Sequence, residues 1–236
     1  MAEEKFRLES DLLGELKVPV DAYYGVQTQR GINNYHISRK KMRDYPDYII
    51  AIAYVKLAAI QTNHSLGVIN DEISGAISKA CQELIDGKLH ENFPIDMMQG
   101  GAGTSVNMNA NEVIANRSLE IMGHKKGEYQ YCYPNDHVNC GQSTNDVYPT
   151  SIRLAIIRMN KNLVASLTAL MGGFTVYALS IGIFIGWLYW VWMAIQLGSF
   201  SMFVFGLLGP FALISSILGI WSFLFGIPGW LLHLVG

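Results

Sequence analysis

The spacing of apolar residues along the chain predicts a mainly helical protein. A run rich in Ile and Ala from Tyr48 to Leu66 predicts a buried helix. Asn70 is a favourable N-cap for a second helix, whose apolar residues keep helical spacing up to Gly87. A third helix is expected to end at Gly123 and to begin at residues 104–105, a Thr-Ser pair that can supply its N-cap. Turn formers dominate residues 1–45, which predicts irregular structure with one short hairpin.

A more regular apolar stripe follows Pro149, a residue suited to the first turn of a helix. Residues 144–146 lie just upstream and offer capping oxygens. The stripe consists of Ile152, Ile156, Met159, Leu163, Leu167 and Leu170. Such a stripe is typical of a helix in a bundle, so residues 149–170 are expected to need partner helices.

Charge divides the chain into two parts. The sequence has 17 Lys and Arg and 19 Asp and Glu, and the last of them is Lys161. Residues 171–236 contain none, yet they hold all 5 Trp residues. A segment this apolar cannot hide its surface from water by itself, so a single soluble domain is excluded. The net charge of −2 gives no basic stripe, and no nucleic-acid partner is expected.

The apolar part predicts a transmembrane helical hairpin with the lipid bilayer as its partner. Its two segments, residues 174–197 and 202–225, each exceed the roughly 20 residues needed to cross a bilayer. A Gly-Ser pair at 198–199 marks the turn, and Gly182 and Gly186 form a G-x-x-x-G match that can bring two helices close. Three cations precede the first segment: Arg153, Arg158 and Lys161. They predict an inner-membrane protein whose N-terminal domain is cytosolic and whose hairpin returns to the same side.

Two segments could carry chemistry, residues 100–109 and 141–150. Each places Ser, Thr and Asn at a predicted helix N-terminus, and Gly residues allow close approach of the backbone. Free N–H groups and the helix dipole favour a carboxylate or phosphate there, although simple capping is the commoner use of such residues. No Lys follows Gly103 as in a phosphate-binding P-loop.

Other candidate groups give weaker signals. His124 and His137 could act as general bases, or they are solvated loop residues. The three cysteines, Cys81, Cys132 and Cys140, lack CxxC spacing, so reduced thiols are expected and no metal site is predicted.

Several longer motifs resemble one known family. They are Asp21–Thr28 (DAYYGVQT), Gln99–Asn109 (QGGAGTSVNMN), Asn111–Glu112, Lys126–Tyr131 (KGEYQY), Pro134–Asn139 (PNDHVN) and Gln142–Asp146 (QSTND). Together they resemble the aspartate ammonia-lyases (aspartases) of the aspartase/class II fumarase family. The resemblance covers residues 8–170, which correspond to the N-terminal third of a family subunit.

The resemblance implies deamination of L-aspartate to fumarate and ammonia without a cofactor or metal. Residues Thr104, Ser143, Thr144 and Asn145 match the family's substrate-binding positions. Hydroxyl and N–H donors suit that role, because proton removal beside a carboxylate builds up negative charge that such donors stabilise. Pro134–Asn139 resembles a second dicarboxylate site of the fumarases, but Tyr133 replaces a family His, and no second site is predicted.

The resemblance also implies what this sequence lacks. The family's catalytic Ser lies in a G-S-S-x-M-P-x-K-x-N loop that occurs nowhere in these 236 residues, so no catalytic residue is predicted. Most of the long helices of the family's tetramer core are missing too, and no homotetramer is expected. The predicted organisation is an aspartase-like domain (1–148), the start of a first bundle helix (149–170) and a membrane domain (171–236).

Three interpretations follow for function. The chain is an aspartase-like fragment, inactive alone; or a non-catalytic two-span membrane protein with a cytosolic aspartase remnant; or the junction of two unrelated coding sequences at Met171, by fusion or by cloning.

Overall fold

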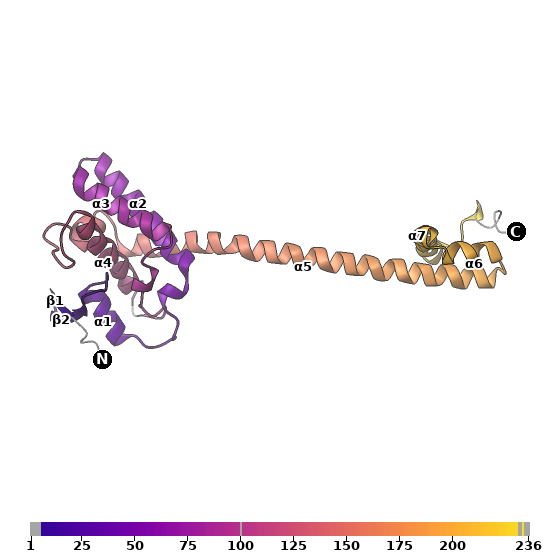
Figure 1. The fold of residues 1–236 in the computed structure, drawn as a ribbon, viewed down its shortest axis with the longest axis horizontal. Helices are drawn as coiled ribbons and strands as arrows, with labels where there is room; N and C mark the ends of the chain where they lie inside the picture. The colour runs from indigo at the N-terminus through magenta and orange to yellow at the C-terminus, as the bar shows by residue number, and fades with distance from the viewer. Residues whose placement is uncertain (1–5, 100, 231–232, 234–236) are drawn as a thin grey trace. The chain divides into compact units, whose positions relative to one another are not determined.

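The computed structural model describes residues 6–99, 101–230 and 233, with the backbone only at 209 and 210. The chain forms two compact units, Met1–Lys161 and Asn162–Gly236 (Figure 1). Helices dominate both units, as the sequence predicted.

The first unit opens with the predicted hairpin. Strands β1 (Phe6–Asp11) and β2 (Gly14–Pro19) pair antiparallel, with Leu8 opposite Lys17. Helix α1 (Val26–Asn34) follows, in a region where irregular structure was expected. Its sequence, VQTQRGINN, has few apolar residues, so its stability depends on contacts with the rest of the unit.

The three predicted helices of this unit are present: α2 (Pro46–Ser65), α3 (Asp71–Ile85) and α4 (Thr104–Ile121). The expected N-cap of α3 is confirmed, because Asn70 Oδ1 accepts a hydrogen bond from Ile73 N at 2.9 Å. Short helical turns lie between the longer helices, at η1 (Met42–Asp44), η2 (His90–Asn92) and η3 (Pro134–Val138).

Helix α4 forms the centre of the first unit. Nearly every residue from Val106 to Asn116 is buried, and α1, α3 and η3 pack around it. The surrounding core comes mainly from α2 and α3, with Ile49, Ile52, Ile60, Ile77, Ala80 and Leu84 fully buried. Although α4 is buried on all sides, it carries polar residues on several faces, and several of these bind neighbouring loops, as described below.

The predicted cap of α4 is wrong. Its N-cap is Gly103, which has a φ of +90° and no side chain to accept a hydrogen bond. The backbone N–H of Val106 instead donates to Oε1 of Gln99, at 3.1 Å. Because Gln99 fills this role, the hydroxyl groups at residues 104–105 do not cap the helix.

Helix α5 (Thr144–Gln196) begins upstream of Pro149, which therefore does not lie in the first turn as predicted. Ser143 and Asp146 hold the start of the helix: Asp146 Oδ1 accepts from Ser143 N at 3.0 Å. Pro149 lies inside the helix, in its second turn, and the carbonyl of residue 145 therefore lacks the N–H that would otherwise pair with it. The stripe predicted to seek partner helices is largely exposed, with Ile156, Leu163 and Leu170 between 57% and 69% accessible.

The second unit contains the remainder of α5, with α6 (Phe200–Leu207) and α7 (Gly209–Phe225). One continuous helix over 202–225 was expected, and this is wrong: the chain breaks at Leu208, and the two helices differ in direction by 120°. The sequence Gly209-Pro210 favours the break, because proline suits the first turn of a helix and lacks the N–H group that a continuing helix would use there.

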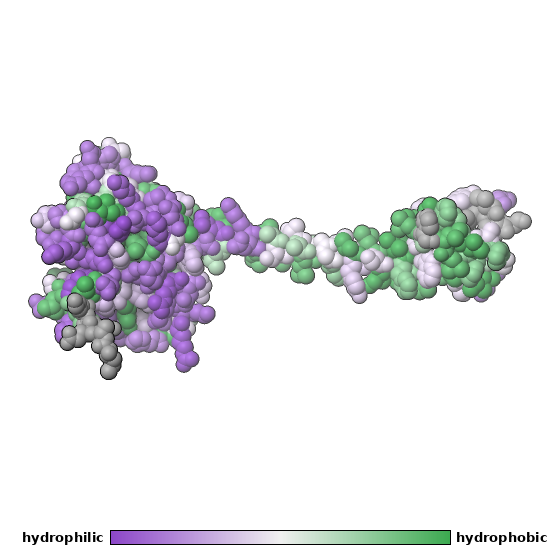
Figure 2. Space-filling model, viewed as in Figure 1, coloured by the Kyte–Doolittle hydropathy of each residue, from purple (hydrophilic) through white to green (hydrophobic). Residues whose placement is uncertain are grey.

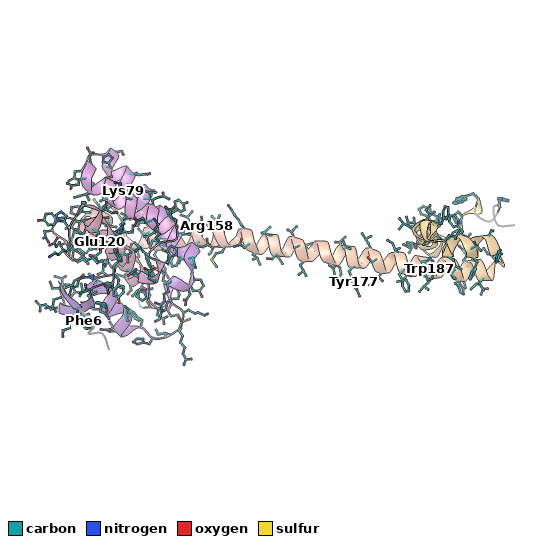
Figure 3. All side chains as sticks on the ribbon, in the orientation of Figure 1. Phe6, Lys79, Glu120, Arg158, Tyr177 and Trp187 are labelled. Carbon is teal, nitrogen blue, oxygen red and sulfur yellow. The ribbon has the colours of Figure 1, made fainter. Side chains whose placement is uncertain are left out.

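The surface of the second unit is strongly apolar (Figure 2). Tyr177 projects from α5 and is 66% exposed, whereas Trp187 lies where α6 packs on α5 (Figure 3). By length and composition, α5 alone could cross a membrane among the described helices, and α6 with α7 adds a second candidate if that bent pair counts as one.

Candidate functional site

The two segments singled out in the sequence lie together in the first unit. Asn107, in the first turn of α4, donates from Nδ2 to Oγ1 of Thr144 at 3.2 Å. Gly103 packs so closely on the Tyr148 ring that a Cβ atom there would overlap it. The start of α4 and the start of α5 are thus adjacent, although 40 residues separate Thr104 from Thr144 in the sequence.

The side chains predicted to bind substrate are open to solvent in this chain. Thr104, Ser143 and Asn145 are exposed, and Thr144 is half-buried. We call these four residues the α4–α5 site. Gly100, part of the first predicted segment, lies outside the described residues.

The backbone at the start of α5 is held by local hydrogen bonds. Asn145 N donates to Oγ of Ser143 at 3.2 Å, and Ser143 N donates to Asp146 at 3.0 Å. These bonds fix the turn from which the hydroxyl and amide groups project. Two adjacent helix N-termini with neutral donors favour an anion such as a carboxylate.

A polar layer that sequence reasoning missed lies under the α4–α5 site. Lys56 of α2 is fully buried, and its Nζ donates to Asn139 Oδ1 at 2.8 Å and to Gln142 Oε1 at 3.0 Å. Asn107 Nδ2 donates to the same Asn139 oxygen at 3.1 Å. Lys56 is thereby connected to Thr144 through two amide side chains.

Burial lowers the pKa of Lys56 to about 7, because removal from water disfavours the charged amine. The negative charge of Asp146 opposes this shift to a smaller degree. Sequence reasoning missed the burial of Lys56, because a lone lysine in an apolar helix usually reaches the surface with its charged end.

Asn107 has a further unusual feature. Its Oδ1 atom is buried and has no hydrogen-bond partner among the described residues, whereas its Nδ2 atom makes two bonds. Buried polar atoms without partners are rare and costly. The two hydrogen bonds that Nδ2 donates therefore orient the side-chain amide of Asn107, and Thr144 accepts one of them.

A second buried polar cluster holds helix α1 and was also missed. The carboxylate of Glu112 accepts from the backbone N–H groups of Gly25, Gln27 and Thr28, at 2.8 to 3.0 Å. Glu9 accepts from Val26 N at 2.9 Å. Two acidic residues distant in sequence therefore cap α1, which explains how so polar a helix is stable. Burial raises the pKa of Glu112 to about 7, against the opposing effect of these hydrogen bonds.

The two candidate histidines have local structural contacts. His124 stacks on the ring of Tyr131, with 3.7 Å between centroids, and His137 Nδ1 accepts from Tyr133 N at 2.7 Å. Both groups stabilise the loops that contain them. In the described ranges, no three His, Cys, Asp or Glu side chains gather as a metal site requires.

Comparison with known proteins gives a consistent match. Residues 14–180 match the family described as Lyase. The aspartate ammonia-lyase of Pseudomonas aeruginosa is 55% identical over 168 residues, which is 71% of this chain and 35% of that protein. The aspartate ammonia-lyase of Helicobacter pylori (strain 26695) is 52% identical, over 71% of this chain and 36% of that protein. This chain thus spans about a third of the length of the curated relatives it matches.

Solved structures give the same result for the fold. A fumarate lyase:delta crystallin from Brucella melitensis superposes with a TM-score of 0.71 at 47% identity, covering 72% of this chain and 37% of that one. A class II fumarase from Schistosoma mansoni gives 0.60 at 40% identity, covering 64% and 32%. The match to the Lyase family extends to residue 180, ten positions beyond the boundary expected from the sequence.

Proposed function

Because the chain belongs to the Lyase family, we propose that the α4–α5 site binds the carboxylates of L-aspartate and fumarate. Named relatives at 52% to 55% identity are aspartate ammonia-lyases, which makes carbon–nitrogen lyase chemistry the activity of this lineage. The observation that supports the proposal most is the contact between Asn107 and Thr144. It brings the N-terminus of α4 and the N-terminus of α5, with their hydrogen-bond donors, to one place.

The arrangement suits the charge that deamination develops. Removal of a proton next to a carboxylate places a second negative charge on that carboxylate. Hydroxyl groups and backbone N–H groups that are already oriented stabilise such charge without reorganisation. Thr104 and Ser143 to Asn145 offer these donors from two helix N-termini.

We assign binding to this chain and assign turnover to residues that it does not contain. The G-S-S-x-M-P-x-K-x-N loop is absent from the 236 residues, so the chain alone binds dicarboxylate but releases no fumarate. The test is to incubate purified chain with L-aspartate and follow the ultraviolet absorbance of fumarate. A steady increase that Thr144→Val abolishes would overturn this assignment.

The 236 residues also lack most of the central helices of a family subunit, and we therefore expect no family homotetramer from this chain. Its exposed stripe on α5 remains without partner helices among the described residues. Light scattering of the detergent-purified chain tests this, and a stable tetramer would contradict it.

A second proposal concerns residues 171–236, which we assign to a lipid bilayer, with residues 1–161 on the cytosolic side of the inner membrane. The described part of the second unit has no ionisable side chain apart from Tyr177, Tyr189 and His233. Large apolar residues cover its surface, among them Phe174, Leu179 and Trp192, each more than half exposed. Alkaline extraction of membranes tests this: the full chain should remain in the pellet, and release into the supernatant would count against it.

Sequencing of long reads across the codons for Leu170 and Met171 tests the junction interpretation. A single uninterrupted reading frame in genomic DNA supports a natural fusion, and separate genes would show a cloning junction.

A further inference from the structure

In the second unit, the direction in which α7 runs relative to α5 differs from the one that the sequence predicted. A simple hairpin turning at residues 198–199 would run antiparallel throughout. The described contacts fit this expectation for α6 and contradict it for α7.

Helix α6 runs back along the end of α5. The indole N–H of Trp190 donates to Met202 O at 3.0 Å, and that of Trp187 donates to Gly206 O at 2.8 Å. Residue numbers fall on α5 as they rise on α6, which defines antiparallel packing. Each indole N–H also satisfies a backbone carbonyl inside the unit, as an apolar environment requires.

Helix α7 crosses α5 at a steep angle (Figure 1), and along the crossing it advances in the same direction as α5. Near its start, Leu213 lines a groove with Phe184. Gly219 then meets the backbone of Gly186 so closely that a Cβ atom at either position would overlap the other helix. Further on, the rings of Phe223 and Tyr189 lie 5.4 Å apart. Here residue numbers rise together on both helices.

Of the two glycines in the G-x-x-x-G match, only Gly186 makes a close helix contact. A Cβ atom at Gly182 would meet no atom of the described residues within 4 Å. Gly186 and Gly219 therefore define the crossing point, and close backbone approach at small residues is the usual way that helices associate in lipid.

We propose that α6 is a short re-entrant helix and that α7 ends toward the same membrane face as the α5–α6 turn, opposite the face from which α5 enters. This rests on the proposed assignment of residues 171–236 to a bilayer. At 1.5 Å per residue, Tyr189 lies about 22 Å along α5 from Phe174 but only about 10 Å from Gln196. Phe223, beside Tyr189, is therefore nearer to the far face.

Disulfide crosslinking of the full chain in membranes tests the direction of α7. The pair Tyr189→Cys and Phe223→Cys should crosslink efficiently. The matched control pair, Thr175→Cys and Phe223→Cys, joins positions that a hairpin turning at residue 199 would bring together, and it should stay uncrosslinked. Mass spectrometry of fragments separates these products from any that involve the native Cys140.

Crosslinking of the Thr175 pair, or of neither pair, would overturn the proposal. Sidedness is measured on the same material with an epitope tag after Gly236, probed by protease on right-side-out vesicles. We expect the tag to be cleaved while residues 1–161 are protected. Protection of both the tag and residues 1–161 would contradict the proposal that α7 ends toward the face opposite the cytosol. Alkaline extraction separates the two proposals: a soluble chain that still crosslinks at the 189–223 pair refutes the membrane assignment alone.

Discussion

Asn107 on α4 donates a hydrogen bond to Thr144 at the start of α5, with 3.2 Å between Nδ2 and Oγ1. The same amide group donates to Asn139, which also accepts from the buried amine of Lys56. A continuous polar layer therefore supports the exposed donors of the α4–α5 site from below. The properties of that layer give the first two predictions.

Replacing Asn107 by Leu should weaken fumarate binding about tenfold or more and destabilise the fold by about 1–3 kcal/mol, since Asn139 and Thr144 lose a donor. Thr150→Val is the matched control, because Thr150 is exposed on α5 and outside the α4–α5 site. Equilibrium binding and chemical unfolding measure the two effects. Unchanged affinity in Asn107→Leu would show that the contact does not position Thr144.

Lys56 should make stability depend on pH above neutrality. Its pKa falls from 10.5 unfolded to about 7 folded, so between these values the unfolded chain binds a proton that the folded chain lacks. The free energy of unfolding therefore rises with pH in this window, with a slope of up to about 1.4 kcal/mol per pH unit. Unfolding curves at several pH values test this. The slope should vanish in Lys56→Met, and a slope that persists there would assign it to another group.

Glu112 should act in the opposite direction at lower pH. Burial raises its pKa from 4.5 to about 7, so the folded chain binds the extra proton between these values. Its contribution to stability is complete below pH 4.5 and declines as the pH rises toward 7. Glu112→Gln should remove this dependence and destabilise α1, because its amide group would face a backbone donor.

The control for Glu112 is Glu120→Gln, at a half-buried residue that pairs with Arg117. Glu112 is intact in that variant, so the pH dependence that Glu112 causes between pH 4.5 and 7 should persist in thermal unfolding. The hypothesis fails if Glu112→Gln retains the parent pH profile.

Gly103→Ala should disrupt the contact between the two helix starts. The new methyl group would overlap the Tyr148 ring, and a φ of +90° is itself strained for alanine. Gly101→Ala separates the two causes, since Gly101 has a φ of +73° but its Cβ would lie 3.9 Å from the nearest atom, Thr104 Oγ1. We expect about 1–2 kcal/mol of destabilisation for Gly101→Ala and a larger loss, with weaker fumarate binding, for Gly103→Ala. Equal effects would mean that the Tyr148 contact contributes nothing.

Local sequence signals predicted much of the first unit. Asn70 caps α3 as expected because its oxygen and the amide that it accepts lie within one turn. Helix α1 was missed because its capping groups, Glu9 and Glu112, come from distant positions. Lys56 was missed for the same reason: its partners lie more than 80 residues away and only the fold brings them near.

The second unit shows a different kind of error. Gly209-Pro210 stands inside the segment predicted as one span, and it was a local signal for the break that the structure has at Leu208. Mean hydropathy detects apolar length but is insensitive to a single residue that ends a helix. The direction of α7, by contrast, depends on the crossing of Gly186 and Gly219, which no local pattern specifies.

The central claim is that one dicarboxylate is bound by the starts of both α4 and α5. Titration of the chain, labelled with ¹⁵N at threonine, with fumarate tests it most directly. The amide signals of Thr104 and Thr144 should shift together with one dissociation constant, while that of Thr150 stays in place. A shift of only one of the two signals, or of neither at saturating fumarate, would contradict the account.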